Sequence, residues 1–417
     1  MPKPTSTARL PQAIKVFWSK LKVPEPAKIS LMIKALKRRS SIFLFFAIFS
    51  IYFLTSAGNT PHDYFTRLAG AFLEGRIYLT ESPPWLNELI PIAGKYYVAY
   101  PPMPAIIAIP FVLVLRNFEQ QWLAHLLGAG TAVIIYKLTL LITKNLPAQA
   151  GKKIAVWMGL LTAFGNVLWF LAATGSSWYL GQVSAAFFLT LAIYETLTKK
   201  RPLLMGIFLG AAYLSRVHTI LSLPFFLYFV FKKRQRLSHF FAGLTPFLIF
   251  NALYNFARFG VLWDKGYMLI SGVLNEPWYQ LGLIHPSYIE RHLRIIFTAL
   301  PVLKDTFPYI FPPWSGLAIW LTTPAFLLAL KAPFKKPVVR MSFLAIALIA
   351  VPILMHGTYG FAQFGYRFAV DVYPFLFLIL IYALPKKLGK IHWLLLFLSI
   401  LVNAWGVVWI NKFGWVV

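Results

Sequence analysis

The chain has 417 residues, of which 59% are hydrophobic and 12% charged. A soluble protein of this length could not hide so much apolar surface, so the composition excludes that class and predicts an all-α protein that crosses a membrane several times. There is no cysteine, which excludes disulfides and thiolate metal sites, and the net charge of +28 lies in loops beside apolar segments, a pattern typical of membrane orientation rather than nucleic-acid binding.

The first 39 residues are strongly basic, with ten Lys and Arg against one acid, Glu25. We expect residues 1–39 to form a cytoplasmic arm on the membrane surface. The first apolar core follows at 42–54 and is interpreted as a signal anchor. A cleaved signal peptide ending near Ser56-Ala57-Gly58 is the alternative, although a 39-residue leader is long for one.

Ten further apolar segments suggest about eleven transmembrane helices in all. They lie at about 122–142, 154–174, 178–197, 202–216, 218–231, 237–257, 314–330, 341–356, 369–384 and 391–410. With the N terminus inside, this topology puts 28 of the 40 Lys and Arg on the cytoplasmic face, together with only two of the 12 acids. The other ten acids fall on or near the outer face.

Two segments test this count. Residues 101–116 are apolar but short and begin with three prolines, and a span here would reverse every later basic cluster, so we expect a surface-lying or re-entrant segment. Residues 202–231 are long enough for one helix, but the basic clusters on both sides belong inside. The chain must therefore cross twice, with Arg216 and His218 at the outer turn.

Two long segments, 58–121 and 258–313, are left on the outer face, where functional residues are expected. Asp63 follows the first span and precedes a segment, 64–74, with helical character. A carboxylate at the bilayer surface can act as a general base toward a hydroxyl group. A helix cap or a solvated loop acid is the alternative.

Four groups of residues, in chain order, resemble motifs of the lipid-dependent membrane glycosyltransferases of the GT-C fold, near the protein O-mannosyltransferase and aminoarabinose transferase branches. The first two are Asp63-Tyr64 with Leu68-Ala69, Phe72-Leu73, Gly75 and Tyr78, and Gly94-Lys95-Tyr96-Tyr97 with Tyr100-Pro101-Pro102. The others are Leu253-Tyr254-Asn255, Arg258-Phe259-Gly260 and Gly266-Tyr267, and Gly365-Tyr366-Arg367-Phe368 with Tyr373-Pro374-Phe375.

The resemblance implies a family module at 40–257, with spans 1–7 and outer loop 58–121, which includes juxtamembrane helices. A variable module would follow at 258–417, with outer loop 258–313 and spans 8–11. It also makes Asp63 the catalytic base. Many family members have two adjacent acids here, whereas this chain has one, so a bound divalent cation stays an open alternative and no metal ligands are assigned.

Arginine suits the phosphate of a lipid-linked sugar because its guanidinium matches phosphate geometry. Arg367 is the first choice for this role, with Arg216 and Lys95 as rivals. The alternative for Arg367 is an ion pair with Asp371, which would share its face if the segment is α-helical. The predicted substrate-binding residues are the motif tyrosines Tyr64, Tyr97, Tyr100 and Tyr366.

The predicted function is therefore transfer of a sugar from a polyprenyl-phosphate carrier to an extracytoplasmic acceptor, and the resemblance implies inversion at the anomeric carbon. The enzyme would sit in the cell membrane with its N terminus in the cytoplasm, and no nucleic-acid partner is expected. A lipid or polysaccharide transporter and a lipid-linked glycan ligase or polymerase are the alternatives.

Overall fold

The computed structural model describes residues 26–115, 117–232 and 236–416, with side chains from Ser40 onward. The chain divides into two compact units, Met1–Leu44 and Phe45–Val417. Helix α2 (Pro26–Leu54) begins in the first unit and ends in the second. Residues 1–25 of the predicted arm, 1–39, lie outside the described residues. Residues 26–39 form the first turns of α2.

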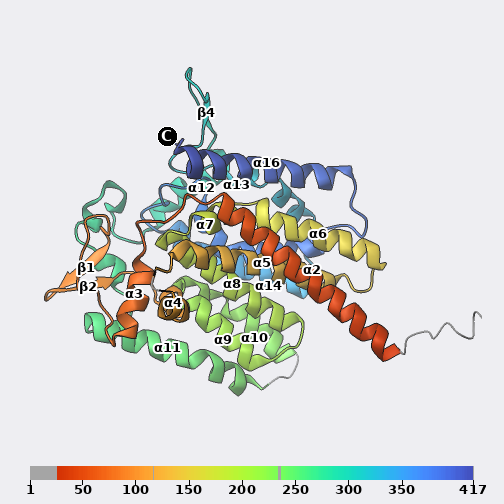
Figure 1. Cartoon of the computed structure of the whole chain (residues 1–417), viewed down its shortest axis with the longest axis horizontal. Coiled ribbons are helices and arrows are strands. Elements are labelled where there is room, and N and C mark those ends of the chain that lie inside the picture. Colours follow the sequence, from red (N-terminus) through yellow and green to blue (C-terminus); the bar gives the residue numbers. More distant parts are fainter. Residues whose placement is uncertain (1–25, 116, 233–235, 417) are drawn as a thin grey trace, which may run out of the picture. The chain divides into compact units, whose positions relative to one another are not determined.

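The second unit is mainly helical, as the composition predicts (Figure 1). Within the described residues, five helices are long and apolar enough to cross a membrane: α5 (Gln120–Ile142), α8 (Ser177–Leu197), α11 (Leu237–Phe259), α14 (Pro337–Leu354) and α16 (Lys390–Phe413). A sixth span results if α6 (Ala148–Phe164) and α7 (Leu168–Thr174), which meet at a 52° bend, count as one. These helices fit a multi-span membrane protein.

The expectation of about eleven spans is wrong for the described helices. Several predicted spans contain only short helices, namely α9 (Pro202–Tyr213), α10 (Leu223–Lys232), α13 (Ile319–Thr322) and α15 (Tyr373–Ala383). The 12 residues of α9 make a helix about 18 Å long, against about 30 Å of hydrocarbon. Hydropathy does not distinguish these short helices from full-length transmembrane helices, because short helices buried among neighbouring helices are equally apolar.

The predicted break within 202–231 is confirmed. Helix α9 ends at Tyr213, and the 3₁₀ helix η1 (Val217–Ser222) begins just after Arg216 and leads into α10. Where α9 crosses α11, a Cβ on Gly206 would collide with the carbonyl oxygen of Phe240. Small residues at such crossings let helix backbones pack closely in a membrane protein.

The segment 58–121 has two short helices and a hairpin. These are α3 (Tyr64–Leu73), β1 (Leu89–Ile92), β2 (Lys95–Val98) and α4 (Met103–Val114). The strands are antiparallel, and the hairpin turns at Ala93 and Gly94, both with positive φ as a tight two-residue turn requires. The expected helix after Asp63 is therefore present as α3, and the short apolar segment 101–116 contains α4.

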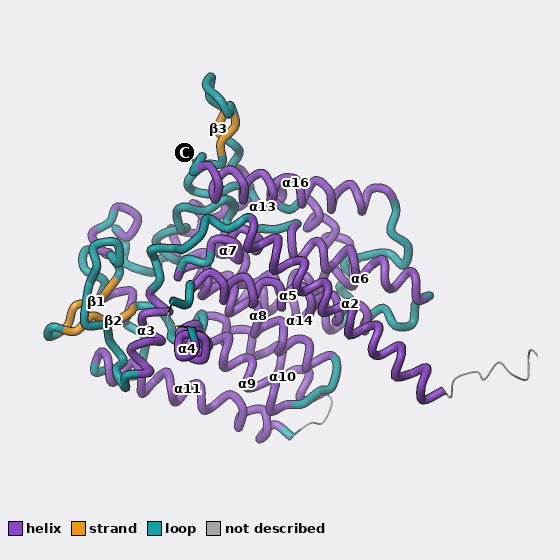
Figure 2. The backbone as a smooth tube through the Cα atoms, in the orientation of Figure 1, coloured by secondary structure: helices purple, strands orange, loops and turns teal. Residues whose placement is uncertain are grey.

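The segment after α11 consists mostly of short helical turns and loops (Figure 2). It contains η2 (Gly266–Leu269), η3 (Val273–Asn275), η4 (Pro277–Tyr279), η5 (Pro286–Tyr288), α12 (Ile289–Thr298), β3 (Val302–Leu303) and β4 (Ile310–Phe311). The remaining elements are the 3₁₀ helices η6 (Pro324–Lys331) and η7 (Arg367–Val372). The break between α9 and η1, the end of α14 and the start of η7 contribute residues to one cavity.

Candidate functional site

A cavity of about 300 Å³ is lined by residues from both of the long loop segments and from the helix breaks. This volume is at the lower end of the range for small-molecule sites. Its polar and aromatic lining includes Tyr100, Ser177, Trp178, Ser215, Arg216, His218, Asp264, Tyr267, His356 and Arg367. The apolar lining includes Phe65, Met268, Leu283, Ile284, Pro352, Ile353 and Phe368. A cavity with two arginines and an otherwise largely apolar wall suits an anionic group attached to an apolar chain.

Arg367 is a cation of this cavity that forms no direct ion pair with a described carboxylate, although Glu88 attracts it from a longer distance. The residue is only 7% exposed. Its Nη1 donates to Oε1 of Gln182 at 3.0 Å, while the Gln182 amide donates to the Arg367 carbonyl at 2.9 Å. Within the described residues, no carboxylate oxygen lies within 4.0 Å of the guanidinium, and Nε has no hydrogen-bond partner. A buried guanidinium with an unused donor favours an anionic ligand.

Asp371 pairs with Arg216 and His218, not with Arg367. Its Oδ2 lies 3.3 Å from Nε of Arg216 and 2.8 Å from Nε2 of His218, and the side chain is fully buried. The alternative of an Arg367–Asp371 pair is therefore wrong. It assumed an α-helix, but η7 is a 3₁₀ helix with about three residues per turn, so a residue four positions on is rotated about 120° away.

Two acids of the segments 58–121 and 258–313 lie at or next to the cavity. Asp264 lines it, and its Oδ1 accepts from the Gly266 amide at 2.8 Å. Burial raises the pKa of Asp264. Glu88 accepts hydrogen bonds at Oε2 from the Tyr100 hydroxyl and, at 2.9 Å, from Nε1 of Trp178, both of which line the cavity. Burial raises the pKa of Glu88 to about 7.

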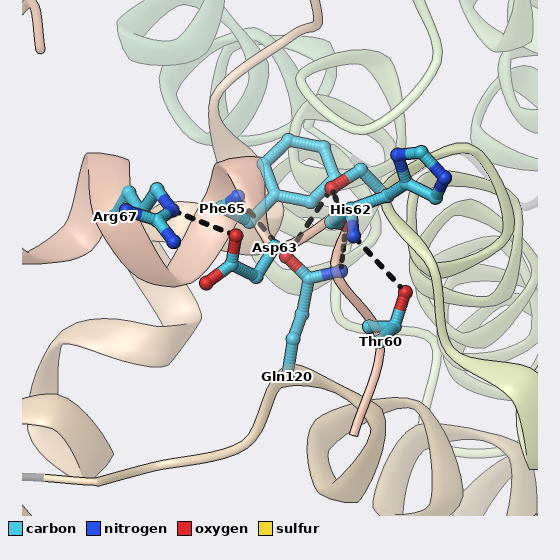
Figure 3. A network of polar contacts seen from close by, with 7 residues as sticks. Thr60, His62, Asp63, Phe65, Arg67 and Gln120 are labelled. Atoms are coloured by element: carbon cyan, nitrogen blue, oxygen red, sulfur yellow. Dashed lines mark hydrogen bonds and ion pairs between the residues drawn. The ribbon is translucent and has the colours of Figure 1, made fainter. Parts of the chain in front are cut away.

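Asp63 is in a different setting (Figure 3). Its Oδ1 lies 2.7 Å from Nε of Arg67, one turn along α3, and both side chains are partly exposed. It occupies the N-cap position of α3 but makes no side-chain capping bond, so the helix-cap alternative lacks its defining contact. Asp63 is not among the residues lining the cavity, although Phe65, two residues further, is.

The backbone around Asp63 is fixed to the helical core by Gln120 of α5 (Figure 3). Its Oε1 accepts from the Phe65 amide at 3.0 Å, and its amide donates to the carbonyls of His62 and Gly175 at 3.3 and 2.9 Å. Ser177 adds a second contact to the His62 carbonyl at 2.7 Å. The position of Asp63 is therefore set by α5 and α8, while its carboxylate is directed to Arg67.

The other predicted binding residues separate into two groups. Tyr100 lines the cavity, and Tyr64 is buried beside it, where its hydroxyl accepts from the Glu88 amide at 3.0 Å. Tyr97 packs against Tyr78 and Phe259, and Tyr366 is buried with its hydroxyl 2.7 Å from Nδ1 of His292. Lys95 is exposed, with its ammonium 4.7 Å from the Tyr78 ring. Arg367, Arg216 and Tyr100 are therefore the predicted residues that share the cavity.

Sequence reasoning missed the roles of His356, His218 and Trp178. The two histidines lie next to helix breaks. The ends of the apolar segments in the sequence could have pointed to them. Trp178 donates a hydrogen bond to Glu88, a residue 90 positions away, and such a contact produces no local pattern in the sequence. Searched over its described part, the chain has no group of three or more His, Asp or Glu side chains arranged to hold a metal ion.

No family model, curated protein or solved structure matches the chain.

Proposed function

We propose that the protein is a membrane glycosyltransferase that uses a polyprenyl-phosphate-linked sugar as donor. Two observations support this function. The ordered motifs resemble those of the GT-C glycosyltransferases, and Arg367 of the last motif lines one cavity together with Arg216, which lies outside the motifs. The apolar helices fit an enzyme that takes its donor from the bilayer.

The observation that carries the proposal is that Arg367 has no ion-pair partner within 4.0 Å among the described residues, while the more distant Glu88 offsets only part of its charge. Asp371 pairs with Arg216 instead, so the cavity retains one buried cation without a direct carboxylate contact in the described part of the chain. Holding such a charge away from water is unfavourable unless a ligand compensates it. A phosphate monoester or diester supplies charge and oxygen acceptors that match the guanidinium, and Arg216 lines the same cavity as a second donor.

The reaction is a single displacement at the anomeric carbon. The acceptor hydroxyl oxygen bonds to that carbon while the bond from the carbon to the phosphate oxygen breaks, so the lipid phosphate leaves with the bonding electrons. The hydroxyl proton passes to a carboxylate, for which Asp63 is the proposed base. Arg367 stabilises the growing charge on the leaving phosphate, a contribution that is strongest in a site shielded from water.

The distribution of Lys and Arg supports a cytoplasmic N terminus and a cavity that opens on the extracytoplasmic side of the cell membrane. The acceptor would then be a hydroxyl-bearing molecule of the cell envelope. The phosphate leaving group supplies the driving force, so the proposed reaction uses no nucleotide.

Binding of undecaprenyl phosphate to the purified protein in nanodiscs tests the proposal. Replacing Arg367 with Ala removes a charge-assisted contact worth about 1.5–3 kcal/mol, so we expect affinity to fall by about ten- to over a hundredfold. Arg340→Ala, at an exposed position of α14, is the matched control and should leave binding unchanged. Equal binding by wild type and Arg367→Ala would refute the donor site.

A second measurement separates a transferase from a transporter. Membranes of the source organism supply the acceptor, and the purified enzyme is added with radiolabelled undecaprenyl-phosphate sugar. A transferase releases undecaprenyl phosphate and moves the label to another molecule. Label that changes membrane side but remains on the lipid would favour the transporter.

A further inference from the structure

His356 is a cavity residue to which the proposed reaction assigns no role. It follows α14 by two residues, and it lines the same cavity as Arg216 and Arg367. The backbone on both sides of it is tied to the segment after α11. The amide of His285 donates to the carbonyl of Met355 at 2.8 Å, and the amide of Gly357 donates to the carbonyl of Leu283 at 2.9 Å. The imidazole is therefore held at a defined point of the cavity wall.

The hydrogen bonds of His356 determine which ring nitrogen has the proton. Its Nδ1 lies 2.9 Å from the carbonyl oxygen of Thr358. A carbonyl oxygen only accepts, so Nδ1 must be the protonated nitrogen. Burial lowers the pKa of His356 to about 4, and the charge of Arg216 acts in the same direction, so the ring is neutral at pH 7. Nε2 therefore has a free lone pair.

A second histidine fixes the backbone at this position. Nε2 of His292 lies 2.9 Å from the carbonyl oxygen of His356, so this nitrogen donates, and Nδ1 of His292 accepts from the Tyr366 hydroxyl at 2.7 Å. Burial lowers the pKa of His292, which favours the same neutral arrangement. Backbone carbonyls, which only accept, thus place the proton on Nε2 of His292 and on Nδ1 of His356.

Aromatic side chains restrict the ring of His356 on several sides. Tyr267 and Tyr279 both contact it edge to face with ring centres 5.7 Å apart, and Phe368 lies at 6.0 Å. Gly357 makes this packing feasible, because a Cβ there would collide with the Tyr279 ring. In the part of the chain that the structure describes, Nε2 of His356 has no hydrogen-bond partner, although the residue lines the cavity. An oriented acceptor in a ligand cavity fixes a donor group of the ligand.

We propose that His356 is a sugar-binding residue whose Nε2 accepts a hydrogen bond from a hydroxyl group of the donor sugar. This inference rests on the proposed function, because the sugar is bonded directly to the phosphate assigned to Arg367 and so must lie in the same cavity. The arginines of the wall can only donate hydrogen bonds. His356 and Asp264 supply the acceptors that a polyhydroxyl ring requires.

Two variants separate the two ring nitrogens. The amide of Asn reaches the place of Nδ1, so His356→Asn can retain the contact with the Thr358 carbonyl and lose the acceptor at Nε2. The amide of Gln reaches the place of Nε2, so His356→Gln can retain that acceptor. If the histidine only holds the loop in place, Asn should be the better substitute.

The experiment compares binding of undecaprenyl phosphate with binding of its glucose-, mannose- and arabinose-linked forms to the protein in nanodiscs. We expect the wild type to prefer at least one sugar-linked form. His356→Asn should reduce that preference by about three- to tenfold, which is the loss of one neutral hydrogen bond. His356→Gln should remain within about twofold of wild type, and both variants should bind the bare lipid normally.

Three results would overturn the inference. These are no preference for any sugar-linked lipid, equal effects of Asn and Gln, and better retention by Asn than by Gln. In each case Arg367-dependent binding of the bare lipid would leave the proposed function standing. If the wild type does not bind bare undecaprenyl phosphate, the proposed function itself fails, and the inference about His356 fails with it.

Discussion

Asp63→Asn is the most informative test of the proposed chemistry. Asn has the size of Asp and can accept a hydrogen bond, but it cannot take a proton from the acceptor. A general base contributes about 10²–10⁴-fold to the rate, so we expect transfer to fall by that factor. Folding should persist, because the side chains of Asp63 and Arg67 are 25% and 35% exposed, and an ion pair so exposed contributes about 0–1 kcal/mol.

Asp264→Asn is the matched comparison, because Asp264 is the aspartate that lines the cavity whereas Asp63 does not. Asn at 264 can still accept from the Gly266 amide through Oδ1, so the local turn should be retained. If Asp63 is the base, Asp264→Asn should weaken binding of the sugar-linked donor with a much smaller effect on turnover of bound donor. The reverse pattern would transfer the role of base to Asp264.

The assay measures label transferred from undecaprenyl-phosphate sugar to source membranes, at saturating donor and with equal amounts of folded enzyme. Thermal unfolding of each variant in detergent verifies that the fold is intact. Turnover of Asp63→Asn within about threefold of wild type would refute the assignment of Asp63. Normal turnover in both variants would refute general-base catalysis by either aspartate.

Three further outcomes are expected. Asp371→Ala removes the buried partner of Arg216 and should destabilise the protein by about 3–5 kcal/mol in thermal unfolding, whereas Glu290→Ala, which breaks an exposed pair with Arg294, should have almost no effect. Burial raises the pKa of Glu88 to about 7, so the folded state holds this proton more tightly than the unfolded state. The stability that results is present at low pH and is lost as pH rises toward 7, and Glu88→Gln should therefore flatten the decline in melting temperature between pH 5 and pH 8. Because the chain has no cysteine, Ser82→Cys and Gly389→Cys can each be labelled alone; an impermeant thiol reagent on intact cells should modify only Ser82→Cys, and the opposite result would invert the proposed topology.

The helical membrane class and one helix break could be predicted from the sequence, because apolar segments and basic clusters are the features on which membrane insertion depends, but the number of spans could not. The break between α9 and η1 followed from two basic clusters that must lie on one face, and the structure confirms it next to Arg216. Helix α3 was likewise expected from its pattern. What hydropathy does not report is helix length. The segment 314–330 is mostly apolar, yet it forms only the four residues of α13 and the 3₁₀ helix η6.

The cavity was less accessible to sequence reasoning because its members come from distant parts of the chain. Arg367, Arg216 and Tyr100 were singled out by residue type and motif, and the cavity contains all three. Tyr366, which belongs to the same motif as Arg367, is instead a hydrogen-bond partner of His292. The motif thus identified a segment that borders the cavity. The direction of each of its side chains, however, depends on packing with elements outside the motif.

Helix type decides which cation is free to bind an anion. If η7 were an α-helix, Asp371 would lie on the face of Arg367 and neutralise it, and Arg216 would be left as the uncompensated arginine. The 3₁₀ geometry rotates Asp371 away to Arg216 and His218 instead. A 3₁₀ helix turns about 120° per residue against about 100° in an α-helix, so over four residues Asp371 is rotated by about 80° more. This rotation determines which arginine Asp371 pairs with, and donor binding that depended on Arg216 alone would argue against Arg367 as the principal phosphate ligand.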